Sequence, residues 1–534
     1  MSDRETKTDP AWWLWMVEQL RQAPDWPADD LPVEMKQTHI SALLLGRRHV
    51  AKLKKPVDFG FLDYTTPEKR LRACEDEVRL NRRLCPDTYL GYGGVIELDG
   101  KINFSGRHGK IVDHCVWMRR LPDDRMLDRL VAENSVTEAM LDRVTTRLAE
   151  FHRTAWRGPE VEKWGSLAEI GHNWRENFAQ TESFIGRTIN AADYVAVRAW
   201  VEQSLAEKAE LFTRRVSEHR IVDGHGDVRC ESVCVMDDAV RIFDCIEFNE
   251  RFRCGDPASE MAFLAMDLDA RGRPDLGYYV TASYQALRGD PDFFRLLPFY
   301  RCYRAYVRGK VLSFELNEPE FSGAEKQAAA ARAAAYFALA RRYAAPLSKP
   351  VIIGVGGLSG TGKTAMARAI AGELGLRVVS ADAVRQALFG DAKKPGAWGE
   401  GAYTAAANEQ TYAQMLERGR ALLLDGHSVV LDATFRRPED RARARVMAET
   451  AGANWRLIEC QLAPEQARQR LEARAAKQEG LSDATWETYL RQRDESQPYC
   501  DAHDMDCLTL DTAGAIAETA RRATDWLRGR DSET

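Results

Sequence analysis

The stretch Val351-Ile-Ile-Gly-Val-Gly-Gly-Leu-Ser-Gly-Thr-Gly-Lys-Thr364 decides the fold of the C-terminal part of this chain. It contains the Walker A pattern GxxxxGK[ST] from Gly357 to Thr364, between an apolar β-branched run and a helix-like segment at 365–374. In such a strand–loop–helix context the loop N–H groups point at phosphate oxygens, and the helix N-terminus adds its positive end. The stretch therefore predicts a binding site for a nucleoside triphosphate.

Within this loop, Lys363 is expected to reach the β and γ phosphates of ATP, and the Thr364 hydroxyl to ligate Mg²⁺. The alternative, a Gly-rich loop that only turns the chain, leaves the flanking strand and helix unexplained. The other residues expected to hold phosphate are Gly357, Leu358, Ser359, Gly360, Thr361 and Gly362.

Downstream of the loop, strand-like and helix-like segments alternate, which predicts a parallel sheet covered by helices on both faces. The expected strands lie at 377–380, 428–433, 455–462 and 506–510. In outline this is a mononucleotide-kinase architecture. We therefore expect an α/β P-loop domain at 350–534, after a helix at 327–345 and a linker bracketed by two prolines.

Two aspartates follow expected strands of this domain. Asp382 stands where open α/β sheets place their ligands, and we expect it to take the proton from an attacking hydroxyl. Arg385 is expected to hold an anionic acceptor or the Asp382 carboxylate itself. Asp432 ends the next strand and is expected to order Mg²⁺ through water. The alternative for Asp382 is a helix N-cap.

Arginines are the third feature of this domain. Arg470 and Arg474 are four residues apart on one helix face and are expected to close over the triphosphate as a lid. Their alternative is a solvated helix face. Five more arginines are expected to be solvated, with a phosphate-backbone track as the alternative: Arg436, Arg437, Arg441, Arg443 and Arg445.

The C-terminal part resembles the predicted kinases related to phage polynucleotide kinase and the zeta-toxin kinases, a group that includes AAA-family ATPases. The resemblance covers about 350–530 and implies ATP-dependent phosphorylation of a hydroxyl, with Asp382 as the base. It rests on the loop at 357–364, Ser380-Ala-Asp382 with Arg385, Val430-Leu-Asp-Ala-Thr434 with Arg441, Tyr403, Arg470 and Arg474.

A second pair of aspartates lies in the N-terminal part. Asp227 stands in the stretch His225-Gly-Asp, and Asp244 ends an apolar strand seventeen residues later. Such a pair suits kinase chemistry, because one carboxylate orients or deprotonates the acceptor hydroxyl and the other holds Mg²⁺.

This pair resembles that of the aminoglycoside-phosphotransferase family, relatives of the protein kinases. The resemblance implies a two-lobed α+β domain at 1–345, in which Lys52 binds phosphate and Glu77 pairs with it; Lys54 shares the face of Lys52. His152 lies where that family carries a histidine, and we expect it to be a satisfied core residue. The stretches 55–62 and 245–249 resemble a narrower subgroup in which such a domain is fused to this kind of P-loop kinase.

One position departs from the phosphotransferase pattern. The family carries a metal-ligating Asn five residues after the catalytic Asp, and here that position is Ser232. A serine hydroxyl is a shorter and weaker ligand than an amide carbonyl. The N-terminal domain is thus a working kinase, a nucleotide-binding pseudokinase or a substrate-recruiting domain.

Composition is that of an ordinary globular protein: 534 residues, 45% hydrophobic and 29% charged. The net charge of −6 supplies no global basic field for nucleic acid. The eleven cysteines form no CxxC pair or zinc-ligand set, so we expect reduced thiols in the cytoplasm. The apolar run at 11–17 is too short to span a bilayer and predicts a docking helix that ends near Pro24.

We expect a cytoplasmic two-domain phosphotransferase that uses ATP and Mg²⁺, most securely through the P-loop domain, with a small-molecule hydroxyl acceptor favoured. One alternative is a polynucleotide 5′-hydroxyl kinase in nucleic-acid repair. Another is a nucleotide-dependent switch that phosphorylates no acceptor, which would not need a base at Asp382. The acceptor's identity and the oligomeric state stay open.

Overall fold

The computed structural model describes residues 9–60, 62–104, 109–318, 321–390, 401–477, 484–500 and 505–533. The chain forms two compact units. The first consists of residues up to 136 together with 143–170 and 209–260, and the second of 137–142, 171–208 and the chain from 261 onward.

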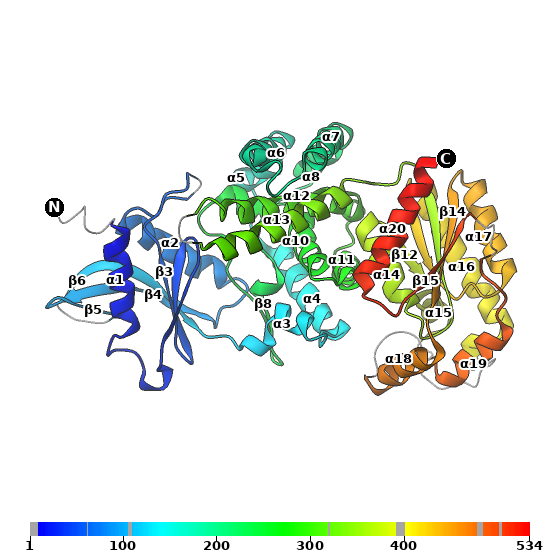
Figure 1. The fold of residues 1–534 in the computed structure, drawn as a ribbon, viewed down its shortest axis with the longest axis horizontal. Helices are drawn as coiled ribbons and strands as arrows, with labels where there is room; N and C mark the ends of the chain where they lie inside the picture. Colours follow the sequence, from blue (N-terminus) through cyan, green and yellow to red (C-terminus); the bar gives the residue numbers. More distant parts are fainter. Residues whose placement is uncertain are drawn as a thin grey trace. The chain divides into compact units, whose positions relative to one another are not determined.

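The first unit is built on a six-stranded antiparallel sheet in the order β1-β2-β3-β6-β4-β5. Its strands are β1 (Glu34–Gln37), β2 (Ser41–Leu45), β3 (His49–Lys54), β4 (Tyr89–Leu98), β5 (Lys101–Asn103) and β6 (Lys110–Arg119). The helix α1 (Pro10–Arg21) covers one face and α2 (Pro67–Asn81) the other (Figure 1). The docking helix expected from the apolar run is therefore confirmed, and it ends at Arg21 rather than near Pro24.

Side chains of β3 alternate between these two faces. Ala51 and Leu53 pack in the core under α1, whereas Val50 packs in the core under α2. Because successive strand residues point to opposite faces, Lys52 and Lys54 share the α2 side with Val50. The alternation therefore places both Lys52 and Lys54 on the side of the sheet that α2 covers.

Short elements complete the first unit. They include two small antiparallel pairs, β7 with β10 and β8 with β9. The elements are α3 (Leu127–Ala132), α5 (Pro159–Glu162), α8 (Ala209–Ser217), β7 (Val222–Asp223), β8 (Val233–Val235), β9 (Val240–Ile242), α9 (Glu250–Arg253) and β10 (Cys254–Gly255), with α4 (Glu138–Thr154) beginning in the other unit. Together with the sheet they form the α+β arrangement that the sequence predicted, and that fold class is confirmed.

The second unit contains a group of helices and a parallel sheet. The helices are α6 (Leu167–Thr181), α7 (Ala191–Glu207), α10 (Pro257–Ala270), α11 (Pro274–Arg288), α12 (Phe293–Phe314) and α13 (Gly323–Tyr343), of which α6 and α10 begin in the first unit. The sheet has the order β12-β13-β11-β14-β15, and every adjacent pair is parallel.

The strands of this sheet are β11 (Val351–Gly356), β12 (Arg377–Ser380), β13 (Val429–Asp432), β14 (Asn454–Gln461) and β15 (Cys507–Asp511). The four strands predicted downstream of the loop are confirmed, to within one residue at each end. The helices are α14 (Lys363–Leu374), α15 (Ala381–Phe389), α16 (Ala405–Leu424), α17 (Pro438–Thr450), α18 (Pro464–Lys477), α19 (Trp486–Glu495) and α20 (Ile516–Glu533). Figure 1 shows α14 and α20 on one face of the sheet and α16 and α17 on the other, so the predicted P-loop architecture is confirmed.

The helix α14 also packs against helices that precede the sheet. It contacts α11 along its length, and Arg301 of α12 donates a hydrogen bond to the carbonyl of Gly372. The Tyr278 hydroxyl of α11 accepts a bond from the N–H of Val378, at 2.8 Å. The domain boundary that we expect between 345 and 350 stays a prediction, while the contacts place α10 to α13 in one unit with the P-loop sheet.

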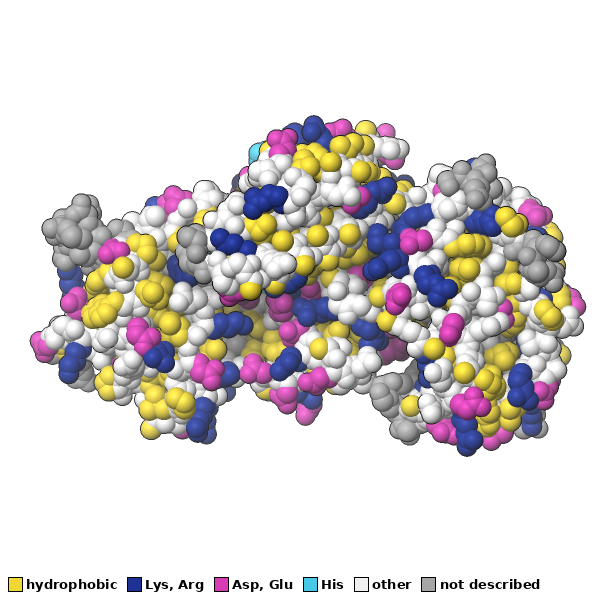
Figure 2. Space-filling view, viewed as in Figure 1, with side chains coloured by type: hydrophobic (Ala, Val, Ile, Leu, Met, Phe, Trp, Pro, Cys, Tyr) yellow, Lys and Arg dark blue, Asp and Glu magenta, His cyan; other side chains and the backbone are white. Residues whose placement is uncertain are grey.

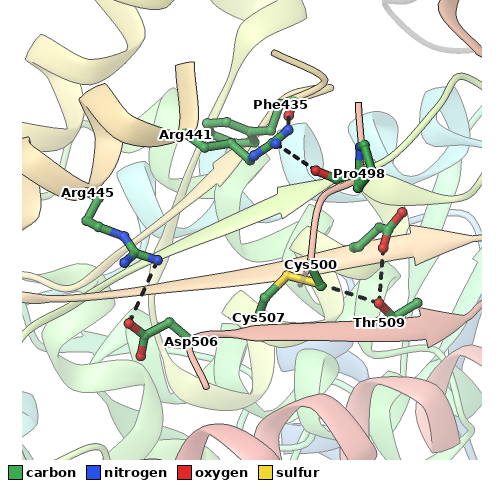
Figure 3. The surroundings of a disulfide bond; sticks show 9 residues. Phe435, Arg441, Arg445, Pro498, Cys500, Asp506, Cys507 and Thr509 are labelled. Carbon is green, nitrogen blue, oxygen red and sulfur yellow. Dashed lines mark hydrogen bonds and ion pairs between the residues drawn. A yellow bond between two sulfur atoms is a disulfide. The ribbon is translucent and has the colours of Figure 1, made fainter. Parts of the chain in front are cut away.

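One expectation about the cysteines is wrong. Cys500 and Cys507 form a disulfide, with Cα atoms 5.4 Å apart (Figure 3). Cys507 opens β15 and Cys500 lies seven residues before it, and that spacing alone does not reveal the pairing. The other nine cysteines are buried and form no disulfide. Among the described residues, none of the helices is both long and apolar enough to cross a membrane.

Candidate functional site

The phosphate loop joins β11 to α14 and has a backbone that only glycine fits. Gly357 has a φ of +133° and Gly360 a φ of +80°. A Cβ atom at Gly357 would lie 2.4 Å from the carbonyl oxygen of Cys460, and one at Gly360 would lie 2.9 Å from that of Ala467. Both distances are too short for a side chain, so the loop keeps its backbone open as a cradle for phosphate.

Lys363 is the first residue of α14 and folds back over this loop. Its Nζ donates to the carbonyl oxygen of Leu358 at 2.9 Å, and the Thr361 hydroxyl donates to the same oxygen at 2.7 Å. Burial lowers the pKa of Lys363 from its usual value, and the carboxylates of Asp432 and Asp382 oppose that shift. The ammonium group therefore lies among the groups expected to surround the terminal phosphates.

Thr364 and Asp432 are brought together as the sequence predicted. The Thr364 hydroxyl donates to Oδ2 of Asp432 at 2.9 Å. Asp432 is buried at the end of β13, where burial raises its pKa and Lys363 opposes the rise. A hydroxyl and a carboxylate are oxygen ligands of the kind Mg²⁺ takes beside phosphates, so these residues fit the ion.

Asp382 is the second residue of α15. The N-cap position belongs to Ser380, so the alternative of Asp382 as a helix cap is wrong. Asp382 lines a cavity of about 630 Å³ together with Lys363, Thr364 and Asp432. Among the described residues, no hydrogen bond or ion pair occupies the Asp382 carboxylate. This leaves it available to a hydroxyl in the cavity.

The three arginines predicted for the site line the same cavity, and so do Arg436 and Arg437, which the sequence predicts on a solvated face. Arg470 donates to the carbonyl oxygen of Thr512 at 2.7 Å, and Arg474 to that of Ala484 at 3.0 Å. Arg385 lies within α15. Ser359, Gly360 and Gly362 also line the cavity, whereas Gly357, Leu358 and Thr361 are not among its lining residues.

The helix α19 contributes lining residues that the sequence did not indicate. Arg491 and Gln492 both face the cavity, and the Gln492 side chain accepts the backbone N–H of Ser359. Tyr403 and Asn408 line it next to Arg385. Tertiary packing brings Arg491, Gln492 and Asn408 to the cavity, and no sequence pattern marked these three, whereas Tyr403 is one of the residues that carry the resemblance to the P-loop kinases.

A separate ion-pair network lies in the first unit. Lys52 Nζ lies 2.8 Å from Oε1 of Glu77 and 2.7 Å from Oδ1 of Asp244. Lys54 contacts the other Glu77 oxygen at 2.5 Å and also Glu247. Burial alone would lower the pKa of Lys52, but Asp244 and Glu77 outweigh it and raise that pKa. In turn, Lys52 lowers the pKa of Asp244, whose side chain is 53% exposed, to about 2.

Asp227 is engaged by an arginine two residues along the chain. Arg229 donates to both carboxylate oxygens of Asp227, at 2.9 and 3.1 Å. Ser232, at the position where the family carries its metal ligand, is buried in the same turn. Its hydroxyl accepts the Arg229 N–H at 3.0 Å and lies 3.1 Å from the Asp227 carbonyl oxygen, to which it donates.

Glu260 holds the loop that carries Asp227 through hydrogen bonds to the loop backbone. This buried carboxylate accepts the N–H groups of His225 and Gly226 and contacts Nε2 of His152 at 2.9 Å. His152 is fully buried, as expected for a satisfied core histidine. Burial would raise the pKa of Glu260, but these partners outweigh it and lower that pKa to about 2.

The sheet order, the loop and the Thr364–Asp432 pair define the second unit's sheet domain as a P-loop domain. An AAA domain family model matches residues 352–498. The chain is 33% identical over 467 residues to the uncharacterized protein Rv2004c of Mycobacterium tuberculosis and to the uncharacterized protein Mb2027c of Mycobacterium bovis, with 86% of this chain and 90% of each relative covered. The chain belongs to the family of these mycobacterial proteins.

Solved structures with a similar fold include a choline/ethanolamine kinase family protein from Mesorhizobium loti, at 11% identity and a TM-score of 0.37, covering 62% of this chain and 99% of that one. The Mycobacterium tuberculosis APS kinase CysC, solved with AMPPNP and APS, is 24% identical with a TM-score of 0.25, covering 34% of this chain and 98% of that one.

Proposed function

We propose that this chain is a kinase that uses ATP and Mg²⁺ to phosphorylate a hydroxyl of a small molecule in the P-loop cavity. The observation that carries the proposal is the gathering of three groups around one cavity: Lys363, the Thr364–Asp432 pair and Asp382. Lys363 would bind the triphosphate, the Thr364–Asp432 pair would hold Mg²⁺, and Asp382 would serve the acceptor hydroxyl.

In the proposed reaction, Asp382 takes the proton of the acceptor hydroxyl as its oxygen forms a bond to the γ-phosphorus. The bond from that phosphorus to the β–γ bridging oxygen breaks, and ADP leaves with the electron pair. Lys363, Arg470 and Arg474 stabilise the negative charge on the transferring group. Mg²⁺, when bound at Thr364 and Asp432, neutralises charge on the β and γ phosphates.

A small acceptor is favoured over a polynucleotide because the five arginines considered as a phosphate-backbone track all have protein partners. Those partners are Glu495 for Arg436, Asp440 for Arg437, the carbonyls of Phe435 and Pro498 for Arg441, Glu409 for Arg443 and Asp506 for Arg445. Figure 3 shows the Arg441 and Arg445 contacts. On the face drawn in Figure 2, acidic and basic side chains are interspersed rather than gathered by sign.

The first unit is proposed to bind nucleotide weakly, with Lys52, which Glu77 holds in place, on phosphate and Asp244 on metal. Asp227 is held by Arg229, and Ser232 is committed to backbone hydrogen bonds, which supports a nucleotide-binding or recruiting role over rapid catalysis. We place both activities in the cytoplasm, where ATP serves as phosphoryl donor.

The deciding experiment measures transfer of labelled γ-phosphate from ATP by the full-length chain to small-molecule and oligonucleotide acceptors. The expected result is a labelled small molecule, lost in Lys363→Ala. ATP binding without transfer to any acceptor would favour the switch instead, and labelled oligonucleotide would favour the polynucleotide kinase. Unchanged ATP binding in Lys363→Ala would remove the basis of the proposal.

A further inference from the structure

Arg385 differs from most of the buried arginines in this chain. Its side chain lines the P-loop cavity and the residue is only 7% exposed. Six other buried arginines each form an ion pair with an aspartate: Arg70, Arg215, Arg241, Arg253, Arg301 and Arg456. Among the described residues, no carboxylate pairs with Arg385.

Within the part of the chain that the structure describes, the partners of Arg385 are neutral. Nη1 donates to the carbonyl oxygen of Ala402 at 2.7 Å and to Oδ1 of Asn408 at 2.9 Å. The guanidinium lies 4.8 Å from the centre of the Tyr403 ring, and its buried Nε has no hydrogen-bond partner. These contacts fix the orientation of the group, and none of the described residues supplies a negative charge to its guanidinium.

Burying a charge without a counter-charge is costly, and proteins seldom leave it so. The Asp382 carboxylate, three residues earlier on α15, does not make this pair within the described structure, although the sequence left that option open. The missing negative charge is therefore one that a ligand in the cavity would bring. A planar guanidinium is well suited to a carboxylate or phosphate.

We propose that the phosphoryl acceptor is a small anion, and that its carboxylate, phosphate or sulfate group binds Arg385 while its hydroxyl lies at Asp382. This inference rests on the proposed kinase function and names its substrate class. Residues three apart on a helix have Cβ atoms about 5–6 Å apart. The hydroxyl and the anionic group of the acceptor are accordingly separated by only a few bonds, as in a hydroxy acid or a sugar phosphate.

The test uses a metabolite extract freed of macromolecules by ultrafiltration and then divided on an anion-exchange column at neutral pH. The full-length chain and γ-labelled ATP are added to the retained and the unretained small-molecule fractions and, separately, to the macromolecules held back by the filter. Acceptor activity is expected in the retained fraction. Activity confined to the unretained fraction would overturn the anionic acceptor while leaving the kinase intact. Activity only in the macromolecular fraction would point to a polynucleotide and overturn it too.

To identify which anionic group the acceptor carries, the retained fraction is treated with alkaline phosphatase. The phosphatase is removed before ATP is added. Loss of acceptor activity identifies a phosphomonoester, and survival identifies a carboxylate or sulfate. ATP bound but transferred to neither fraction would overturn both proposals. If the chain bound no ATP at all, the kinase proposal itself would be overturned.

Variants then connect the acceptor to Arg385. Arg385→Gln is expected to raise the acceptor KM by about tenfold or more, the usual effect of losing a charge-assisted hydrogen bond, and to raise it more than the ATP KM. Arg385→Lys keeps the charge and should recover part of the loss. Arg420→Gln, on the exposed side of α16, is the matched control. An acceptor KM that is unaltered in Arg385→Gln would exclude this pairing, and thermal unfolding checks that each variant is folded.

Discussion

The side-chain oxygen of Gln492 on α19 accepts a hydrogen bond from the backbone N–H of Ser359 in the phosphate loop, at 2.9 Å. Both residues are buried, although 133 positions separate them in the chain. A helix at the far side of the cavity thus satisfies one of the loop's own amides. The conformation of the phosphate loop therefore depends on the position of α19.

Replacing Gln492 by Leu should weaken ATP binding. The change leaves the Ser359 N–H buried without a partner, which costs about 1–3 kcal/mol, or roughly a 5- to 150-fold rise in Kd. Calorimetry on the full-length chain measures it. Arg493→Gln is the control, because Arg493 is exposed and pairs with Asp494. Wild-type affinity in the Leu variant would show that the bond does not order the loop.

Asp382→Asn should leave ATP affinity intact and slow phosphoryl transfer by about 10²–10⁴, the usual contribution of a general base. The amide keeps the shape of the carboxylate but takes no proton. Single-turnover transfer from labelled ATP gives the rate, with Asp425→Asn, an exposed residue at the end of α16, as the control. Transfer at the full rate would assign Asp382 no part in the chemistry.

Residual nucleotide binding by a Lys363→Ala chain should disappear when Lys52 is also changed to Ala. The first substitution disables the P-loop, so the second reports on the first unit alone. Removing Lys52 takes away the contact that joins Glu77 to Asp244. Equilibrium dialysis with labelled ATP detects weak binding, and Lys36→Ala on β1 serves as control. Residual binding that persists would place the second nucleotide site elsewhere.

Glu260→Gln should destabilise the chain most at neutral pH. The pKa of Glu260 falls from 4.5 to about 2 in the folded state, so the ionised carboxylate stabilises the fold above its unfolded pKa. That contribution, about 3 kcal/mol, is lost as the pH falls through the folded value. The difference in unfolding free energy between wild type and variant should therefore shrink between about pH 5 and pH 2.

Denaturant unfolding followed by tryptophan fluorescence at several pH values measures this difference. Glu218→Gln is the control, since Glu218 lies near the surface and pairs with arginines. A difference independent of pH would mean that the ionised form of Glu260 has no special role beneath the Asp227 loop.

The sequence predicts those parts of the fold and site that depend only on residues close together in the chain. The loop at 357–364 carries its chemistry in adjacent residues, and the alternation along β3 alone places Lys52 and Lys54 on one face. The strand ends at Ser380, two residues before Asp382, and at Asp432 follow from apolar runs followed by polar residues. Such signals need no knowledge of distant segments.

What sequence does not predict depends on how distant segments meet. The bond from Ser359 to Gln492 and the neutral surroundings of Arg385 arise only when helices pack on the sheet. The engagement of Asp227 by Arg229 is local, but it depends on side-chain rotamers, which a motif does not specify. The position of Ser232 predicts a weak metal ligand, and the structure instead places its hydroxyl in hydrogen bonds with the backbone.

The packing of α11 and α12 on α14 bears on how such a chain is inherited. The side of α14 that meets these helices holds the carbonyl of Gly372, bonded to Arg301, within a buried contact. A gene fragment beginning at the linker after α13 would encode a P-loop segment with that side exposed to water. Recombination that moves this segment into another protein has to carry α11 with it or supply a matching surface. We therefore expect the P-loop segment and the helices packed on α14 to be inherited as one piece.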